Sequence, residues 1–188
     1  MKVYVLLGHP EEDSFNKKIY KSYCDSARKA GHEVRSQILS EMKFDPILWQ
    51  GYKEIQALEP DLVEAQQNIL WCEKWVIIYP MWWGSMPALL KGFFDRTLHP
   101  GFGFKAHEKG TMWDKLLKGR QAHVISTCDA PNFWVSVVYR NADKFTIKKA
   151  ILEYCGIKPV KFNRFDRIKF KSETELKKIL EKIDLLAK

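Results

Sequence analysis

The stretch Tyr79-Pro80-Met81-Trp82-Trp83-Gly84-Ser85-Met86-Pro87-Ala88-Leu89-Leu90-Lys91-Gly92 decides the fold of this chain. It follows residues 75–78, a short continuous apolar run typical of a strand buried in a parallel sheet. The apolar spacing after it, from Leu89 to Thr97, predicts one face of a helix. Two adjacent tryptophans therefore stand where a strand gives way to a helix. In open α/β sheets, ligands bind at that carboxyl edge.

The tryptophan pair allows two interpretations. Trp82 and Trp83, held between Pro80 and Gly84, suit a rigid apolar wall against a planar ring. Alternatively, both indoles simply complete the hydrophobic core. The rest of the chain favours the first interpretation, in which the two indoles form a wall against a planar ring.

Further strands and helices are predicted on both sides of this segment. The patterns predict strands at residues 3–8, 32–39, 75–79, 120–127 and 157–162, and helices at 14–30, from 60, at 87–98, at 141–155 and from 172. Strands that alternate with helices favour a parallel sheet covered on both faces, and five strands favour the flavodoxin-like order 2-1-3-4-5 over a six-stranded dinucleotide fold. No linker is visible, so we expect a single flavodoxin-like domain over residues 1–188, with the α/β architecture of a three-layer sandwich.

Two long connections are predicted as loops. Residues 99–119 contain Phe102, Phe104, Met112 and Trp113 between glycines, which is too apolar for a merely solvated loop. We expect this segment to act as a lid or a partner contact, and its exposed apolar groups predict a symmetric homodimer. Residues 128–134 are predicted to be a second loop at a strand's carboxyl end.

The segment from Gly8 to Asn16 lies between the first strand and its helix. A helix N-terminus offers free N–H groups and the positive end of the helix dipole, so it suits a phosphate. Ser14 and Asn16 add donors beside Phe15, and His9 can donate a hydrogen bond. Neither a G-x-G-x-x-G nor a G-x-x-x-x-G-K-[ST] motif occurs, which counts against a Rossmann site and a P-loop. The alternative is that Asp13 or Ser14 only caps the helix and His9 is structural.

A third candidate is the segment Thr127-Cys128-Asp129 after the fourth strand. Its backbone amides could bind the edge of a ring that lies against the tryptophans. The alternative is an ordinary loop capped by Asp129. Cys128 is a poor nucleophile candidate because the neighbouring carboxylate does not favour a thiolate. The five histidines show no ligand spacing, so no metal site is predicted.

Composition narrows the class further. The formal net charge is +8 over 188 residues, and the excess of Lys and Arg lies in residues 81–188. These residues are scattered, which indicates a solvated basic face or a field that attracts an anionic dinucleotide, and not nucleic acid. No apolar stretch approaches the ~18 residues of a membrane helix. The first ten residues read as a strand rather than a signal peptide, and four cysteines without a C-x-x-C pair suit reduced thiols in a cytoplasmic protein.

At these residues the chain resembles the flavodoxin-like NAD(P)H:quinone oxidoreductases, which include drug-activity modulators, general stress proteins and potassium-efflux ancillary subunits. His9-Pro10 with Ser14-Phe15-Asn16 matches the family's first loop. The run from Tyr79 to Trp83, continued through Met86 to Arg96, matches its flavin-stacking segment. The resemblance covers roughly residues 3–160.

The resemblance implies a homodimer that binds one flavin per subunit, FAD or else FMN, and takes electrons from NAD(P)H. His9, Ser14, Phe15 and Asn16 would hold phosphates, while Pro80, Met81, Trp82 and Trp83 would hold the isoalloxazine. A ping-pong reaction would then reduce a quinone or similar small electrophile. The third loop departs from the family's glycine-rich pattern, because Thr127-Cys128-Asp129-Ala130 stands there.

Two other functions remain open from the sequence. One is an electron-transfer flavodoxin, although such proteins are acidic and carry a hydroxyl-rich phosphate loop. The other is a flavin-binding regulatory subunit that docks on a membrane transporter. The sequence does not distinguish NADH from NADPH.

Overall fold

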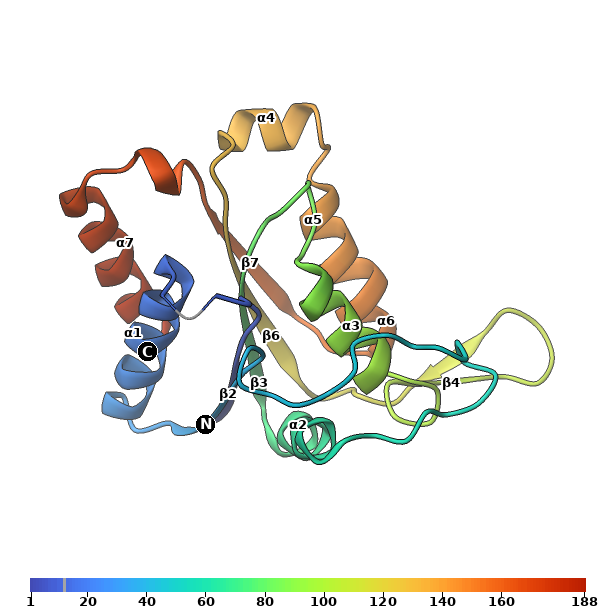
Figure 1. The fold of residues 1–188 in the computed structure, drawn as a ribbon. Helices are drawn as coiled ribbons and strands as arrows, with labels where there is room; N and C mark the ends of the chain where they lie inside the picture. Colours follow the sequence, from blue (N-terminus) through green and yellow to red (C-terminus); the bar gives the residue numbers. More distant parts are fainter. Residues whose placement is uncertain (12) are drawn as a thin grey trace.

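The computed structural model describes residues 1–11 and 13–188, and its centre is a five-stranded parallel sheet (Figure 1). The strand order is β2-β1-β3-β6-β7, which confirms the predicted order. The strands are β1 (Lys2–Leu7), β2 (Glu33–Ile38), β3 (Lys74–Pro80), β6 (Gln121–Thr127) and β7 (Val160–Phe165). The predicted flavodoxin-like architecture is therefore correct.

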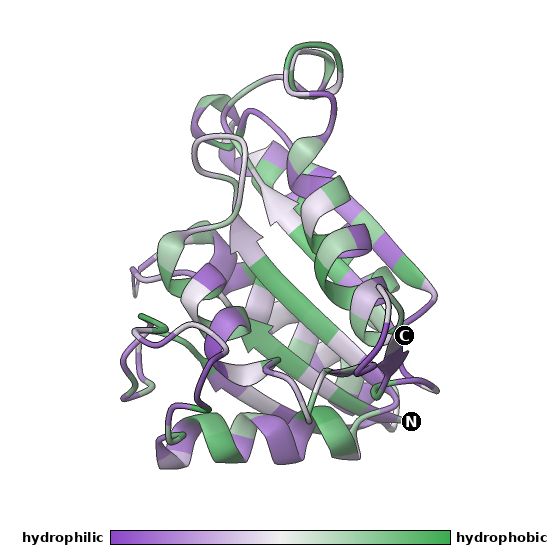
Figure 2. Cartoon of the chain, turned by 90° about the vertical axis from the view of Figure 1, so that its right-hand side faces the viewer, coloured by the Kyte–Doolittle hydropathy of each residue, from purple (hydrophilic) through white to green (hydrophobic). Residues whose placement is uncertain are grey.

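Helices cover both faces of the sheet, which makes the three predicted layers. Figure 1 shows α1 and α7 on one side of the sheet and α3, α5 and α6 on the other. The bounds are α1 (Phe15–Lys29), α2 (Pro60–Trp71), α3 (Ala88–Thr97), α5 (Ala142–Phe145), a π-helix (Thr146–Leu152), α6 (Glu153–Cys155) and α7 (Glu173–Leu186). Apolar strand residues run through the interior between the layers (Figure 2). The sheet separates two hydrophobic core clusters, one on each face. Successive residues of β1 and β3 pack alternately into one cluster and the other, as the two-residue period of a strand requires.

The helix-start signals in the sequence hold in the structure. The Ser14 hydroxyl oxygen accepts from the Lys17 N–H at 3.3 Å, so Ser14 is the N-cap of α1. Ser172 and Glu175 form a reciprocal capping box at the start of α7. The start of α1 lies at the carboxyl edge of the sheet, and the amides of Phe15 and Asn16 in its first turn have no partner within the helix.

Two boundaries differ from the predictions. The last strand covers Val160–Phe165 rather than 157–162, because the Ile157 N–H bonds the Leu152 carbonyl and still belongs to the helix end. The predicted loop at 128–134 contains the start of a short helix, α4 (Asn132–Val137). Within α4 only Val135 is buried, so no buried apolar stripe marks this helix in the sequence.

Residues 99–119 are not the exposed apolar loop that the sequence suggested. They contain an antiparallel hairpin of β4 (Phe104–Ala106) and β5 (Trp113–Lys115). The Trp113 ring stacks on Tyr154 with centroids 4.4 Å apart, and Phe104 meets the edge of the same tyrosine at 5.1 Å. Phe102, Phe104 and Trp113 are consequently half-buried, and of the four only Met112 is exposed. The expected exposure of these three rings is therefore wrong, and with it goes the reason for placing a partner contact at this segment.

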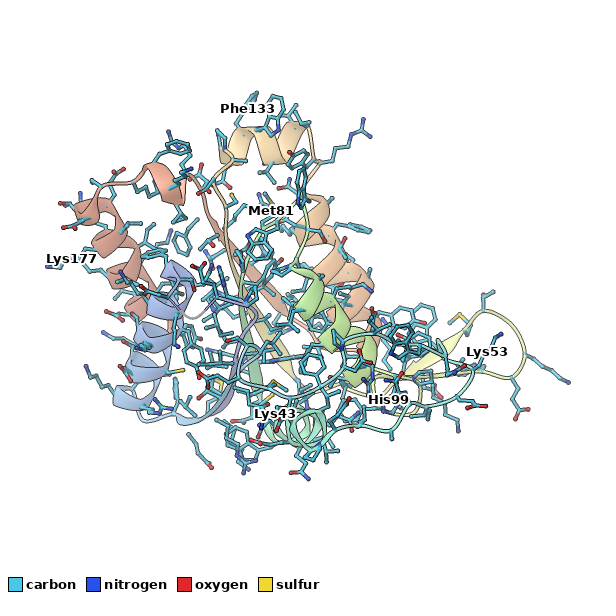
Figure 3. The ribbon with its side chains drawn as sticks, viewed as in Figure 1. Lys43, Lys53, Met81, His99, Phe133 and Lys177 are labelled. Carbon is cyan, nitrogen blue, oxygen red and sulfur yellow. The ribbon has the colours of Figure 1, made fainter. Side chains whose placement is uncertain are left out.

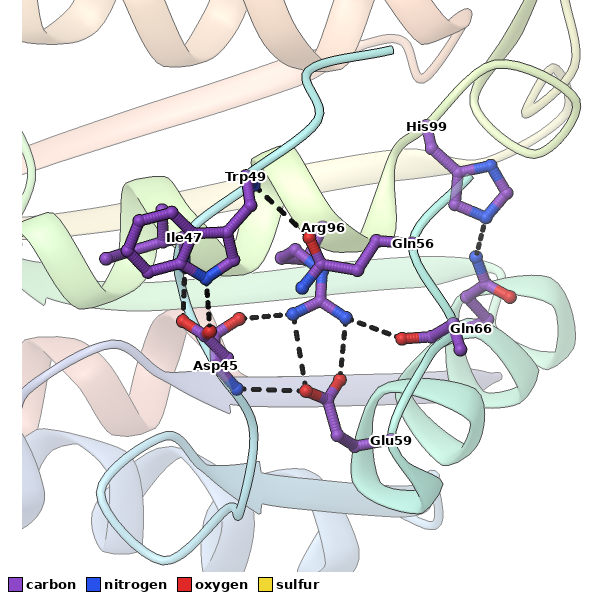
Figure 4. Close-up of polar contacts among 9 residues, drawn as sticks. Asp45, Ile47, Trp49, Gln56, Glu59, Gln66, Arg96 and His99 are labelled. Atoms are coloured by element: carbon purple, nitrogen blue, oxygen red, sulfur yellow. Dashed lines mark hydrogen bonds and ion pairs between the residues drawn. The ribbon is translucent and has the colours of Figure 1, made fainter. Parts of the chain in front are cut away.

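The segment of residues 40–59 crosses the α2–α3 side of the molecule as an irregular strap. Arg96 of α3 is 1% exposed and bonds the carbonyls of Asp45 and Ala57 and the Glu59 carboxylate, with 2.8 Å from Nη2 to Oε2 (Figure 4). The Asp45 amide donates to Glu59 at 3.0 Å. This one guanidinium therefore holds both ends of the strap against the helix.

Within residues 1–11 and 13–188, none of the helices has the length and apolarity that crossing a membrane requires. The four cysteines are free and buried. Among the same residues there is no cluster of three or more His, Cys, Asp or Glu that could hold a metal ion.

Candidate functional site

Three loops at the carboxyl edge of the sheet enclose a hollow of about 310 Å³. They follow β1, β3 and β6, the three central strands, so the hollow lies where doubly wound sheets bind ligands. Ten of the eleven candidate residues line it, namely His9, Ser14, Phe15, Asn16, Pro80, Met81, Trp82, Thr127, Cys128 and Asp129. The eleventh, Trp83, does not.

The first and third loops are joined by a buried hydrogen bond. The Asn16 amide nitrogen donates to the Thr127 hydroxyl at 2.9 Å, and both side chains are almost fully buried. Ser14 uses its oxygen lone pair for the helix cap, which leaves its hydroxyl hydrogen free to donate. The start of α1 is thereby fixed against the end of β6. Its first-turn amides and the Ser14 hydroxyl face a common space.

His9 is a neutral donor in this site. Its Nδ1 accepts from the Glu11 N–H at 3.0 Å, which places the ring proton on Nε2. Burial lowers the pKa of His9 and outweighs the opposite effect of the Glu11 carboxylate, so the ring is uncharged at neutral pH. The imidazole also meets the Trp82 ring edge-on, with centroids 5.6 Å apart. His9 therefore positions Trp82 and retains one N–H for a ligand.

The Trp82–Trp83 segment forms a tight turn. Trp82 and Ser85 exchange two backbone hydrogen bonds of 2.9 Å, and the two residues between them have left-handed backbone angles, with φ of 50° for Trp83 and 71° for Gly84. Glycine adopts this conformation freely, but a bulky residue does not, so Trp83 is strained. The turn directs the two neighbouring indoles differently.

Both indoles are exposed, which excludes the interpretation that they complete the core. Trp82 is 44% exposed and lines the hollow, while Trp83 is fully exposed and lies outside it. Trp83 lines a neighbouring apolar groove of about 480 Å³, and Trp82 stands between the groove and the hollow. Of the tryptophan pair, Trp82 is thus the residue positioned as the wall.

Below Trp82, Met81 closes the floor of the hollow. Its amide donates to the Thr127 carbonyl at 2.7 Å, which continues the β3–β6 ladder to the edge of the sheet. Met81, Cys128 and Val135 form a small buried cluster that holds α4 to the sheet. Figure 3 shows Met81 near the top of the sheet, beneath the helix that carries Phe133.

The third loop is tied to the segment that follows β7. The Cys128 amide donates to the Phe165 carbonyl at 2.9 Å, and the Asn132 amide donates to Asp166. These two amides are therefore already engaged and do not face a ligand. The Asp129 carboxylate accepts from the Lys169 amide at 2.9 Å, so it fixes the rim of the hollow and is not the helix cap. Burial raises the pKa of Cys128 to about 11, which keeps it a thiol.

Three lining residues were not found from the sequence. Glu11 and Asp13 belong to the first loop, but only the fold shows that they reach the hollow. Ile168 lies in a short 3₁₀ turn (Ile168–Phe170), and its amide donates to the Cys128 carbonyl at 3.2 Å. No local motif marks Ile168, because only the pairing of β6 with β7 brings it to this edge.

The charge of the hollow limits what it can bind. Glu11, Asp13 and Asp129 contribute carboxylates, and no Lys or Arg is among its described lining residues. A phosphate would therefore be held by neutral donors at the start of α1, namely amides, the Ser14 hydroxyl and His9 Nε2. These donors fit a phosphate, and Trp82 beside buried Met81 fits a planar ring. The residues present are therefore compatible with a flavin nucleotide.

A second hollow, of about 320 Å³, lies between α3, the hairpin and the π-helix. It is largely apolar, and the ion pair of Lys91 and Asp95, 2.6 Å apart, stands at its rim. It lacks the convergent donors of the first hollow. We therefore place the candidate site at the carboxyl edge.

The family of the chain follows from comparison with known proteins. Residues 1–186 match the model of a protein family that is described as having the flavodoxin-like fold. The chain belongs to this family. An uncharacterised NAD(P)H oxidoreductase of Haemophilus influenzae is 28% identical over 96% of this chain and 91% of that protein. The rat NAD(P)H dehydrogenase [quinone] 1 is 26% identical over 82% of this chain but only 65% of its own length, so the chain spans less than two thirds of that enzyme.

Solved structures give the same fold. The crystal structure of Smu.1420 from Streptococcus mutans superposes with a TM-score of 0.84 at 29% identity, covering 100% of this chain and 98% of that one. An FMN-dependent NADH-azoreductase from Bacillus anthracis in complex with FMN has a TM-score of 0.70 at 20% identity, covering 99% and 97% of the two chains. The second likeness concerns the fold alone.

Proposed function

We propose that the chain is a flavin-dependent NAD(P)H oxidoreductase that reduces a quinone or a similar small electrophile by a ping-pong reaction. The observation that carries the proposal is the convergence of a helix N-terminus, an aromatic wall and a buried Asn16–Thr127 clamp on one hollow. The family, and relatives with NAD(P)H oxidoreductase and quinone dehydrogenase names, support the reaction class. We also propose that the protein works in the cytoplasm, where reduced thiols such as its four free cysteines are the rule.

Each part of the hollow has a role in this proposal. The first turn of α1, Ser14 and His9 Nε2 would bind the phosphates, and Trp82 with Met81 would hold the isoalloxazine. When bound, the flavin would supply the redox chemistry, accepting hydride and passing electrons on. The protein would orient the ring, exclude water from its buried side and keep His9 neutral.

The first test is the identity of the bound molecule. We expect the purified protein to be yellow and to release FAD on heating, with FMN as the alternative, as absorbance and mass spectrometry would reveal. A colourless protein that takes up neither FAD nor FMN would overturn the proposed function. The resemblance, and not the volume of the hollow, is the reason for placing FAD first.

We further propose that the working unit is a homodimer whose contact lies beside the hollow. Around α4 and the Trp83 turn, an unusual number of large apolar side chains are exposed: Trp83, Phe133, Trp134, Val137, Val138, Tyr139 and Phe145. Tyr139 approaches the turn closely, since a Cβ added to Gly84 would lie 3.5 Å from its ring. Large apolar side chains exposed together in this way are typical of a surface that contacts a partner.

Substitution within the patch tests the dimer. We expect Phe133→Ser combined with Val137→Ser to convert a dimer into a monomer in sedimentation velocity, because both side chains are more than half exposed. Met112→Ser, a change to the exposed methionine of the hairpin, is the matched control and should remain dimeric. A wild-type protein that sediments as a monomer at micromolar concentration would contradict the proposal.

A further inference from the structure

A separate cavity of about 350 Å³ opens at the amino ends of the strands, opposite the edge that carries the candidate site. It lies where β3, β6 and β7 begin and where α7 ends. Its lining includes three lysines, Lys74, Lys161 and Lys188, together with His123. Leu185 and Leu186 of α7 form its apolar side.

The strand registers bring the three key side chains to one face of the sheet. His123 lies directly opposite Lys161, and Val76, two residues beyond Lys74, lies opposite His123. Because successive side chains alternate between faces, Lys74, His123 and Lys161 all face the α1–α7 layer. Their convergence is therefore built into the central sheet and does not depend on a loop.

The charged side chains that line this cavity are all cationic. Among the described residues that line it, none is Asp or Glu. Burial lowers the pKa of Lys74, and the charge of Lys161 lowers it further. Burial lowers the pKa of His123, the hydrogen bond with Asn163 at 2.8 Å opposes that effect, and the charges of the two lysines lower the pKa further. The imidazole also meets the ring of Tyr23 from α1.

Two features offset part of this charge without removing it. Lys188 is within electrostatic reach of Asp184, so we base the site on Lys74 and Lys161. The end of α7 presents the negative end of its dipole, equivalent to about half an elementary charge. The combined positive charge of the Lys74 and Lys161 side chains is larger than this partial negative charge.

We infer that this cavity binds a small phosphate-bearing anion, either free phosphate or a phosphate monoester. Lys74 from β3 and Lys161 from β7, the strands on either side of β6, would each donate to the phosphate oxygens. An ammonium is a common point-charge partner for phosphate. The ring of His123 would form the floor. Leu185 and Leu186 offer contact for the carbon part of a monoester. This binding is independent of the proposed redox function.

The experiment is an NMR titration of the full protein, which has five histidines that report on different places. Inorganic phosphate and glycerol 3-phosphate are added at constant ionic strength to about 10 mM, roughly ten times a millimolar dissociation constant. We expect saturable shifts of the His123 imidazole resonances. Tighter binding of glycerol 3-phosphate would identify a monoester site, and equal or weaker binding would identify a site for free phosphate.

Variants make the assignment specific. Lys74→Met and Lys161→Met should each weaken phosphate binding about tenfold or more, the change expected for one charge-assisted hydrogen bond. Lys177→Met, on the exposed face of α7 (Figure 3), is the control and should bind like the wild type. Circular dichroism confirms that each variant is folded. Shifts confined to His9, no saturable shift at all, or unchanged affinity in both variants would overturn the inference.

Discussion

Trp82→Ala is expected to weaken flavin binding by about 2 kcal/mol, roughly thirtyfold, while the apoprotein stays folded. Stacking of a planar ring on an aromatic side chain contributes about 1–3 kcal/mol by alanine substitution. Trp82 is 44% exposed, so its truncation leaves no cavity in the core and should cost little stability. Flavin titration of the apoprotein by fluorescence measures the affinity, and thermal unfolding of the same apoprotein measures the stability.

Trp83→Ala is the matched control, because it removes the same ring from the next residue. Trp83 lies outside the hollow, so its flavin affinity should stay within about threefold of the wild type. Both variants are examined by sedimentation, since Trp83 belongs to the proposed dimer contact. A large loss of affinity in Trp83→Ala with none in Trp82→Ala would show that the ring is bound from the opposite side of the turn.

Glu59→Gln is expected to lower the free energy of unfolding by about 3 kcal/mol. It removes the charge that partners Arg96, and a buried charge left without its counterion costs about 3–5 kcal/mol. We take the lower end because Glu59 is 29% exposed, although Arg96 is only 1% exposed. Urea denaturation at neutral pH measures the loss. Flavin affinity should not change, because the strap does not line the hollow.

The same pair predicts a pH dependence. Burial raises the pKa of Glu59, but hydrogen bonds from the Asp45 amide, its own amide and Arg96 outweigh it, so the net pKa lies below the ordinary value of 4.5. A depressed carboxyl pKa contributes stability that is complete above that ordinary value and is lost as the pH falls through the folded-state pKa. Glu59→Gln should therefore flatten this part of the acid-induced loss of stability.

Asp95→Asn is the control for the strap. It breaks the exposed Lys91–Asp95 pair on the same helix, and exposed i,i+4 pairs contribute only about 0.3–0.5 kcal/mol. A similar loss in Asp95→Asn and Glu59→Gln would mean that Arg96 is solvated in solution. The strap would then not depend on it.

Much of the carboxyl edge could be predicted because it rests on local signals. Ser14 caps α1 and the apolar run of β3 ends at Pro80, so the first two loops follow from spacing and the parallel order brings them together. The buried Asn16–Thr127 bond then explains why residues 111 positions apart share one site.

The remaining features depend on contacts that sequence patterns do not encode. Trp83 does not line the hollow, because Trp83 and Gly84 are the two positive-φ residues of the tight turn that follows Trp82. The hairpin of residues 104–115 packs Trp113 and Phe104 against Tyr154, a residue of α6, so these two rings are half-buried while Met112 stays exposed. Ile168 reaches the hollow only through the pairing of β6 with β7. Helix α4 was missed because its apolar residues are mostly exposed and only Val135 is buried, so its sequence does not show the one-sided apolar stripe of a packed helix.

The most direct test of the central claim is anaerobic reduction of the flavin-loaded protein by NADPH or NADH, followed by addition of a quinone. We predict that the visible flavin absorbance bleaches on addition of the nicotinamide and returns when the quinone is added, with no ternary complex required. Trp82→Ala reconstituted with saturating flavin should bleach more slowly. A bound flavin that neither nicotinamide reduces, or a protein that binds no flavin, would contradict the assignment of this edge as the redox site.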